Sequence, residues 1–329
     1  MSRQMTIERR PVGVVDTRPV EAFTLANGAG LHVEVWSWGA TLVEVRTPGR
    51  DGRLANVVLR LPDLATYRDR ARNPYVGSTI GRYCRCVADG RLLLNGTRYQ
   101  LDRNDGRHHV HGGGEGFDRR VWAAEAGRDG DAVAVTFTLD SPDGDQGYPG
   151  ALRAECTYRV DDADRLTIEY RATTSATTVV GLTNHAFWNL AGHGTVDSHL
   201  LRLNADRFVP FDEDLIPLPG PPRPVADGPL DYRRPRVLGS AAIDNFFPLD
   251  DPSLAAELHH PDSGRLLRVT TDEPGIGVYT GDGYPTPRAG ICLETGAWPD
   301  APNRPDFPSV VLEPHEVYHR RTTYAFRVV

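Results

Sequence analysis

The chain has 329 residues, of which 40% are hydrophobic and 25% charged, as in a globular protein, and its formal net charge is −7. This negative charge argues against a nucleic-acid or anionic-membrane partner, so we expect a small-molecule substrate. All 37 basic residues are arginine, which excludes Schiff-base, pyridoxal-phosphate and Walker-type lysine chemistry.

The N-terminal residues are charged, and no run approaches the roughly 20 apolar residues of a membrane span. These features predict a cytoplasmic protein. The four cysteines have neither zinc-ribbon spacing nor the pattern of a disulfide framework, so we expect buried free thiols. They are Cys84, Cys86, Cys156 and Cys292.

Apolar residues alternate with polar ones along most of the chain, which predicts β-strands. The first two are expected from residue 31 and from residue 42, with a turn at 48–52 between the second and the next. Further strands are expected at 56–61, 81–87, 91–94, 97–101, 132–139, 152–160, 166–172, 266–271 and 275–280.

Only residues 64–70 read as a short helical turn, and no long segment has a helical period. Residues 207–235 are rich in proline and aspartate, yet strand-like patterning resumes beyond them without a change in composition. We therefore interpret this segment as an irregular ordered loop and not as a linker. The chain is predicted to be one large all-β domain spanning residues 1–329.

A candidate site begins at residues 104–118, N-D-G-R-H-H-V-H-G-G-G-E-G-F-D, where three histidines precede three glycines. Histidine exchanges protons near neutral pH, and glycine leaves room for a ligand. Further on are His185 in G-L-T-N-H-A-F-W-N-L-A-G and Glu294 in I-C-L-E-T-G. Two histidines and a glutamate suggest acid/base chemistry, whereas a glycine-rich surface loop with solvated histidines is the alternative.

With these residues the chain resembles the aldose 1-epimerase (galactose mutarotase) family along nearly its whole length. Matching stretches include W-S-W-G-A-T-L-V-E-V, G-S-T-I-G-R-Y, S-P-D-G-D-Q-G-Y-P-G, P-G-I-G-V-Y-T-G and L-E-T-G-A-W-P-D-A-P-N-R-P-D-F-P. The resemblance implies a single-domain β-supersandwich that interconverts the α and β anomers of a sugar without a cofactor. A monomer or a homodimer is expected.

Mutarotation needs a base at the anomeric hydroxyl and an acid at the ring oxygen. The resemblance implies that Glu294 is the base, His185 the acid, and His111 a second imidazole in the same region. Asp244, in A-I-D-N-F-F, falls where the family has a sugar-binding aspartate, and Asn184 is a further candidate contact. An H-x-H pair at His109 and His111 could instead hold a metal, but no metal is expected.

This sequence departs from the family at residues that hold the sugar. The family's substrate-contacting Asn-Arg pair is Arg85-Cys86 here, and the Gln of P-G-x-Q-x-Y-T-G is Gly277. Each lost hydrogen bond to a buried partner costs about 1–3 kcal/mol, so we expect weak activity on ordinary hexoses. Glycine also makes space, which favours a substrate that is larger or less hydroxylated than a hexose. Arg85 could restore the cation, although neighbouring strand residues point to opposite faces.

The usual Asn-Ser before the family's L-H-G-G is His108-His109, so His109 is also a candidate substrate contact. Three functions remain open on these residues: a sugar mutarotase with an altered pocket, a relative recruited to ring opening, ring closure or isomerisation of a non-sugar, and a catalytically idle sugar-binding module.

Overall fold

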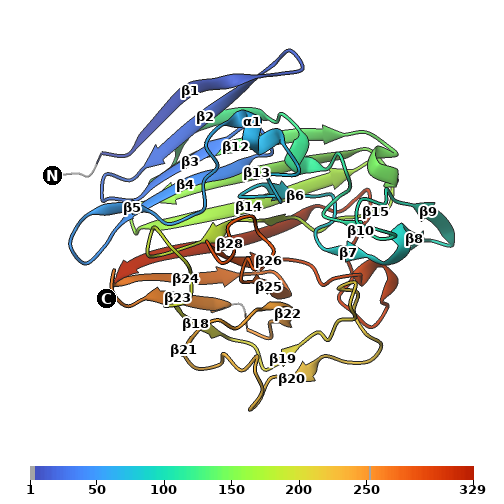
Figure 1. Ribbon diagram of the computed structural model, residues 1–329. Coiled ribbons are helices and arrows are strands. Elements are labelled where there is room, and N and C mark those ends of the chain that lie inside the picture. Colours follow the sequence, from blue (N-terminus) through green and yellow to red (C-terminus); the bar gives the residue numbers. More distant parts are fainter. Residues whose placement is uncertain (1–3, 252) are drawn as a thin grey trace.

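The computed structural model describes residues 4–251 and 253–329, which form β-sheets with one short α-helix (Figure 1). A five-stranded antiparallel sheet at the N-terminal end has the order β1-β2-β3-β4-β5. Its strands are β1 (Thr6–Val15), β2 (Arg18–Ala26), β3 (His32–Trp36), β4 (Thr41–Pro48) and β5 (Leu54–Asn56).

The largest sheet has nine strands in the order β11-β12-β13-β14-β28-β24-β23-β18-β21. Along the chain these are β11 (Ala123–Asp129), β12 (Ala132–Ser141), β13 (Leu152–Asp161), β14 (Arg165–Thr174), β18 (Leu200–Leu203), β21 (Arg236–Val237), β23 (Ala256–His260), β24 (Arg265–Thr271) and β28 (Tyr318–Val328). The C-terminal strand β28 therefore lies between β14 and β24, in the middle of the sheet (Figure 1).

A four-stranded sheet has the order β17-β26-β25-β22, and five pairs of short strands complete the fold. The four strands are β17 (Phe187–Trp188), β22 (Asp244–Pro248), β25 (Gly275–Tyr279) and β26 (Ile291–Thr295). The pairs are β6 (Thr79–Ile80) with β16 (Thr183–Asn184), β7 (Cys86–Val87) with β10 (His109–Val110), β8 (Arg91–Leu94) with β9 (Thr97–Gln100), β15 (Thr178–Val179) with β27 (Val311–Leu312), and β19 (Arg207–Phe208) with β20 (Arg223–Pro224).

Alternating side chains build the main core between the first sheet and the nine-stranded sheet. Along β13 the even-numbered residues from Leu152 to Val160 are buried, while Arg153 and its alternate neighbours face outward. Phe23 of β2 meets Phe137 of β12 edge to face, with ring centroids 5.9 Å apart. Such burial of apolar surface on both sheets is what holds the layers together.

The single α-helix, α1 (Leu64–Arg68), lies within the predicted helical turn. The Asp63 carboxylate accepts a hydrogen bond from the Thr66 amide, 2.8 Å away, and so caps its first turn. Short 3₁₀ turns occur at Ala88–Gly90, Phe117–Arg119, Asp145–Gly147 and Ala301–Asn303. No helix in the described part of the chain has the length and apolar character that a membrane crossing requires.

Two predicted strands are largely wrong. The strand expected at 56–61 ends at Asn56, because the Asn56 side-chain oxygen accepts hydrogen bonds from the Val45 and Val58 amides and turns the chain away. Of the strand expected at 81–87, only the last two residues form a strand, because Arg85 before them has a left-handed backbone with φ +77°. The hairpin β1-β2 and strand β28 were not predicted.

Residues 207–235 contain β19 and β20 but are otherwise irregular, as predicted. Their side chains Val209, Val225 and Tyr232 are buried in the core, so the segment is ordered and not a linker. All four cysteines are free thiols, and all but the half-buried Cys86 are buried, which agrees with the prediction.

Candidate active site

The four-stranded sheet places Phe246, Gly277 and Glu294 side by side in one row across neighbouring strands. In its register Phe246 of β22 pairs with Gly277 of β25, which pairs with Glu294 of β26. Residues directly opposite each other in an antiparallel sheet point to the same face. The bare Gly277 therefore leaves a gap between the Phe246 ring and the Glu294 carboxylate.

His185 reaches this row from the segment between β16 and β17. Its amide donates to the Ser78 carbonyl at 3.0 Å, and its carbonyl accepts from the Gly77 amide at 2.8 Å, which fixes the backbone. The Nε2 atom lies 3.7 Å from Oε1 of Glu294, and both side chains are buried. The Cys292 thiol lies 3.5 Å from Nδ1, and burial raises the pKa of this thiol, which keeps it neutral.

His111 completes the cluster from the end of β10, where its backbone has φ +53°. Its Nδ1 accepts a hydrogen bond from the Arg85 amide at 3.1 Å, so in the neutral ring Nε2 carries the proton. One ligand-type atom from each of His111, His185 and Glu294 lies within 4.8 Å of the others. This is the grouping that the sequence motifs predict.

Burial controls the charge of both imidazoles. It lowers the pKa of His111 well below its usual 6.5, and the neighbouring His185 and Arg85 lower it further. Burial also lowers the pKa of His185, although the negative charge of Glu294 opposes that effect. A protonated His185 is therefore a stronger acid than an exposed histidine.

Arg85 fills the gap that Gly277 leaves. Its Nη1 lies 3.2 Å from Oε2 of Glu294, and its Nη2 donates to the Glu294 carbonyl at 2.8 Å. The guanidinium carbon lies 5.5 Å from the centre of the Phe246 ring, within the range of a cation–π contact. A Cβ atom at position 277 would overlap the guanidinium. The left-handed backbone at Arg85 directs the side chain into the pocket, so the cation absent from position 86 is supplied by its neighbour.

Two buried polar atoms in this cluster have no hydrogen-bond partner among the described residues. They are Nε of Arg85 and Oε2 of Glu294. Oε2 has Nη1 of Arg85 as its ion-pair partner at 3.2 Å but accepts no hydrogen bond within the described part of the chain. Buried polar groups normally have hydrogen-bond partners, so this donor and this acceptor indicate a site for a polar ligand.

Asp244 stands at the start of β22 and is exposed to the open pocket. The surrounding protein and then the charge of Glu294 raise its pKa to about 6. Cys86 also lines the pocket, and burial raises the pKa of its thiol to about 12, so it stays neutral. Both predicted residues therefore line the pocket that contains His111, His185 and Glu294.

His109 and Asn184 do not face the pocket, which corrects their predicted place. Both His109 nitrogens are used in the interior: Nδ1 lies 2.6 Å from the Asp102 carbonyl and Nε2 lies 2.6 Å from the Tyr148 hydroxyl. The Asn184 amide nitrogen donates to the Gly77 carbonyl at 2.7 Å and to the Tyr158 hydroxyl at 3.1 Å. Both side chains hold loops of the site in place and are not candidate substrate contacts.

Tyr75 was missed by the sequence analysis. Its ring meets His111 edge to face at 4.7 Å and stacks on His185 at 5.9 Å. The Arg70 guanidinium covers the Tyr75 ring at 4.0 Å and forms an ion pair with buried Asp118 at 2.6 Å. The sequence contained one indication of its place, because Tyr75 lies two residues before the G-S-T-I-G-R-Y motif.

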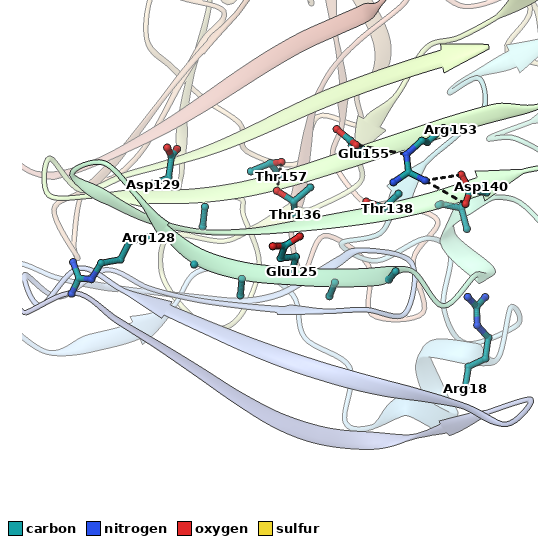
Figure 2. A pocket seen from close by; sticks show the side chains of 16 residues that line it. Arg18, Glu125, Arg128, Asp129, Thr136, Thr138, Asp140, Arg153, Glu155 and Thr157 are labelled. Atoms are coloured by element: carbon teal, nitrogen blue, oxygen red, sulfur yellow. Dashed lines mark hydrogen bonds and ion pairs between the residues drawn. The ribbon is translucent and has the colours of Figure 1, made fainter. Parts of the chain in front are cut away.

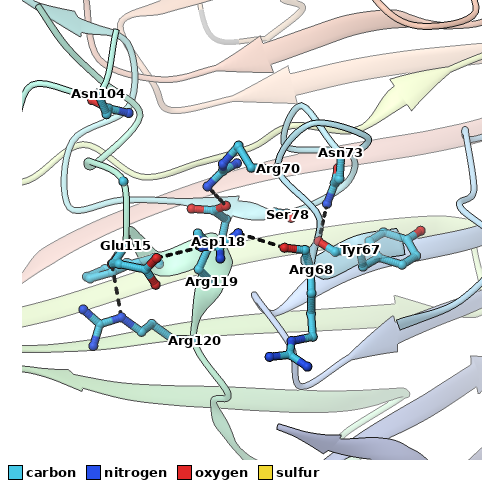
Figure 3. Close-up of polar contacts among 12 residues, drawn as sticks. Tyr67, Arg68, Arg70, Asn73, Ser78, Asn104, Glu115, Asp118, Arg119 and Arg120 are labelled. Carbon is cyan, nitrogen blue, oxygen red and sulfur yellow. Dashed lines mark hydrogen bonds and ion pairs between the residues drawn. The ribbon is translucent and has the colours of Figure 1, made fainter. Parts of the chain in front are cut away.

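Hydrogen bonds and an ion pair hold the segment that carries Tyr75 in place, and Figure 3 shows those around Asp118. The Arg119 guanidinium donates to the Arg68 carbonyl at 2.9 Å, and the side-chain amide of Asn73 donates to the Tyr67 carbonyl at 2.8 Å. This network holds the Tyr75 ring against the two imidazoles and so limits their movement.

The pocket at this cluster has a volume of about 180 Å³. A larger hollow of about 720 Å³ lies over β11, β12 and β13 (Figure 2). There Arg153 pairs with Asp140 at 3.2 Å and the Thr136 and Thr157 hydroxyls bond to each other at 2.8 Å. No buried titratable group of the described residues converges on this hollow, so the smaller pocket is the candidate active site.

Comparison with known proteins shows the family of this chain. The family model for aldose 1-epimerase matches residues 21–325. The chain belongs to the aldose 1-epimerase family. It is 39% identical to the galactose mutarotase of Sus scrofa over 94% of each chain. It is 34% identical to the aldose 1-epimerase of Escherichia coli K12 over 97% of this chain and 99% of that relative.

Solved structures of the family have the same fold. The galactose 1-epimerase from Lactobacillus acidophilus NCFM superposes with a TM-score of 0.89 at 27% identity and covers 99% of both chains. A GalM/aldose epimerase homologue from C. elegans has a TM-score of 0.84 at 30% identity, covering 91% of this chain and 96% of that one. The predicted galactose mutarotase-like β-supersandwich is confirmed. This aldose 1-epimerase family member is an isomerase that interconverts anomers, and recruitment to a non-sugar reaction is not favoured.

Proposed function

We propose that this isomerase interconverts the α and β anomers of a free monosaccharide, with Glu294 as base and His185 as acid. The observation that carries this assignment is the buried contact between the two groups, 3.7 Å apart, in which Oε2 of Glu294 accepts no hydrogen bond from the described part of the protein. An acid and a base must lie near the same reacting atoms, and these two do. The volume of about 180 Å³ is below the roughly 300–1,000 Å³ of sites for drug-sized ligands, which favours a single sugar ring.

In the ring-opening step Glu294 removes the proton of the anomeric hydroxyl. The carbon–oxygen double bond of the aldehyde forms as the bond from C1 to the ring oxygen breaks, and protonated His185 gives its proton to that oxygen. Rotation about the C1–C2 bond presents the other aldehyde face. The reverse transfers close the ring, so one proton is shared by the pair throughout and no cofactor takes part.

The other groups hold this arrangement. His111 presents an N–H to the pocket because its Nδ1 accepts from the Arg85 amide. Arg85 steadies the Glu294 carboxylate and offers its unpaired Nε to a sugar hydroxyl. Asp244 accepts hydrogen bonds from hydroxyls farther along the ring when it is ionised. Four further properties remain predictions from the sequence: a single domain, a cytoplasmic location, carbohydrate binding, and a monomeric or homodimeric state.

Polarimetry of freshly dissolved α-galactose and α-glucose tests the proposal. The wild-type enzyme should speed the approach to anomeric equilibrium, and His185→Asn should lower kcat by about 100-fold or more. His315→Asn, an exposed histidine, is the matched control and should be as active as the wild type. A His185→Asn variant within threefold of the wild type would exclude His185 as the acid.

A further inference from the structure

Six of the residues that line the active-site pocket have side chains without a strong hydrogen-bond donor or acceptor. We call this set the apolar wall. Its members are Cys86, Val110, Phe211, Leu215, Phe246 and Pro299. The Cys86 thiol does not change this, because its raised pKa of about 12 keeps it neutral and a thiol is a weak donor. One of the six, Phe246, also contacts the Arg85 guanidinium, whose carbon lies 5.5 Å from the ring centre.

Leu215 is held toward the pocket by an unusual backbone. It lies in a turn in which the Asp212 amide donates to the Ile216 carbonyl at 3.0 Å. Its φ is +59°, which is uncommon for a residue with a branched side chain, and the residue is 41% exposed at the pocket mouth. A strained backbone that displays an apolar side chain beside catalytic groups indicates a ligand contact.

The turn that carries Leu215 is held to the rest of the protein by a contact of the preceding residue, Asp214. Oδ2 of Asp214 lies 3.3 Å from Nε2 of His108, which is itself buried. Nδ1 of His108 accepts from the Asp89 amide at 3.1 Å, and Nε of Arg107 lies 3.2 Å from the same Nε2. His108 is one of the residues by which this sequence departs from its family. The turn that carries Leu215 is therefore held in place through a residue at which this sequence departs from its family.

The pocket is not enlarged at Gly277, because the Arg85 guanidinium occupies that space. Of the two substrate types that the sequence left open, the less hydroxylated one fits. A hydroxyl pressed against the apolar wall would lose its hydrogen bonds to water without finding a side-chain partner. A methyl group at that place would gain from burial.

We propose that the preferred substrate is a 6-deoxyhexose whose exocyclic methyl group packs against the apolar wall. The proposal rests on the proposed function, since it requires the anomeric hydroxyl to lie within hydrogen-bond reach of Glu294 and the ring oxygen within reach of His185. The exocyclic carbon is the part of a hexose that extends beyond the ring, and its hydroxyl is the one whose loss leaves a methyl group.

Two pairs of sugars that differ only in this hydroxyl test the proposal: D-galactose with 6-deoxy-D-galactose, and D-glucose with 6-deoxy-D-glucose. Polarimetry gives kcat/KM for each. The wild type should favour the 6-deoxy sugar in at least one pair by about tenfold or more, as expected when one unpaired hydroxyl is removed. Leu215→Asn should reduce that preference to below threefold, because asparagine tolerates the left-handed backbone and replaces only the apolar side chain. Leu93→Asn, an exposed leucine on β8, is the control and should keep the preference.

A preference below tenfold in both pairs overturns the inference and leaves the proposed function intact. A tenfold preference that persists unchanged in Leu215→Asn overturns the assignment to the apolar wall. An enzyme that speeds none of the four mutarotations contradicts the proposed function itself, and the inference with it.

Discussion

The guanidinium of Arg85 occupies the space that a side chain at Gly277 would fill. The two residues are far apart in sequence, yet the guanidinium of Arg85 lies directly over the Gly277 backbone, between Phe246 and Glu294. The sequence suggested that glycine here enlarges the pocket for a substrate. The structure shows that the room is taken by an arginine, which restores the cation that position 86 lacks. The two departures from the family compensate for each other.

This relationship predicts that Gly277→Ala impairs the enzyme. A Cβ atom would displace the Arg85 guanidinium from Glu294, so kcat/KM on the best sugar should fall by about tenfold or more, the effect of losing one charge-assisted hydrogen bond. Gly127→Ala is the matched control, because it lies on strand β11 with no atom near its Cβ position. Full activity of Gly277→Ala would show that Arg85 need not occupy its observed place. Replacement by glutamine, which the family has here, should be at least as damaging.

The cluster of His111, His185 and Glu294 has a spacing that could also suit a metal ion. We predict that dialysis against a strong chelator leaves kcat unchanged, because the proposed chemistry needs only proton transfer between Glu294 and His185. Polarimetry before and after dialysis gives the comparison. Loss of activity on chelation, with recovery on adding zinc and not magnesium, would mean that these side chains are ligands.

Glu273 is a buried carboxyl outside the active site. Burial raises its pKa to about 8, although Arg320, 3.6 Å away, opposes the shift, and the Tyr318 hydroxyl donates to its Oε1 at 3.1 Å. Between an unfolded pKa of about 4.5 and the folded value, the folded state holds a proton that the unfolded state has lost. The free energy of unfolding should therefore fall as pH rises through this window, by up to about 1.4 kcal/mol per pH unit.

Glu273→Gln should remove this contribution, because the amide is neutral at every pH. Urea unfolding at pH 6, 7 and 8 measures it: the stability of the variant relative to the wild type should increase with pH. Glu125→Gln, an exposed glutamate, should track the wild type. A constant difference between Glu273→Gln and the wild type from pH 6 to 8 would show that Glu273 is ionised throughout.

The three proposed catalytic residues could be found from the sequence because each lies in a short motif whose chemistry is local. Arg85 could not be placed in the same way. Alternation along an extended strand predicts that it points away from the face of Cys86, and only its left-handed backbone reverses this. Backbone conformation of that kind is set by tertiary contacts, here the Arg85 carbonyl and amide bonded to His111.

Other residues were misplaced or missed because their partners are distant in the chain. The role of His109 depends on the Tyr148 hydroxyl, 39 residues away, and no local pattern shows that its imidazole is already satisfied. Leu215 lies in an irregular segment without periodicity, so nothing in the sequence indicates that it reaches the pocket. Four strands of the nine-stranded sheet, β12, β13, β14 and β24, were predicted well, since their alternation is a property of contiguous residues.

The central claim is that Glu294 acts as the base for anomer interconversion. The measurement that tests it most directly is the polarimetric rate for freshly dissolved α-galactose and 6-deoxy-α-galactose with the wild type and with Glu294→Gln. The amide keeps the shape and the contact with Arg85 but cannot accept the proton, so kcat should fall by about 100-fold or more while the melting temperature stays within a few degrees of the wild type. A folded Glu294→Gln enzyme that retains at least a third of the wild-type kcat would contradict the account.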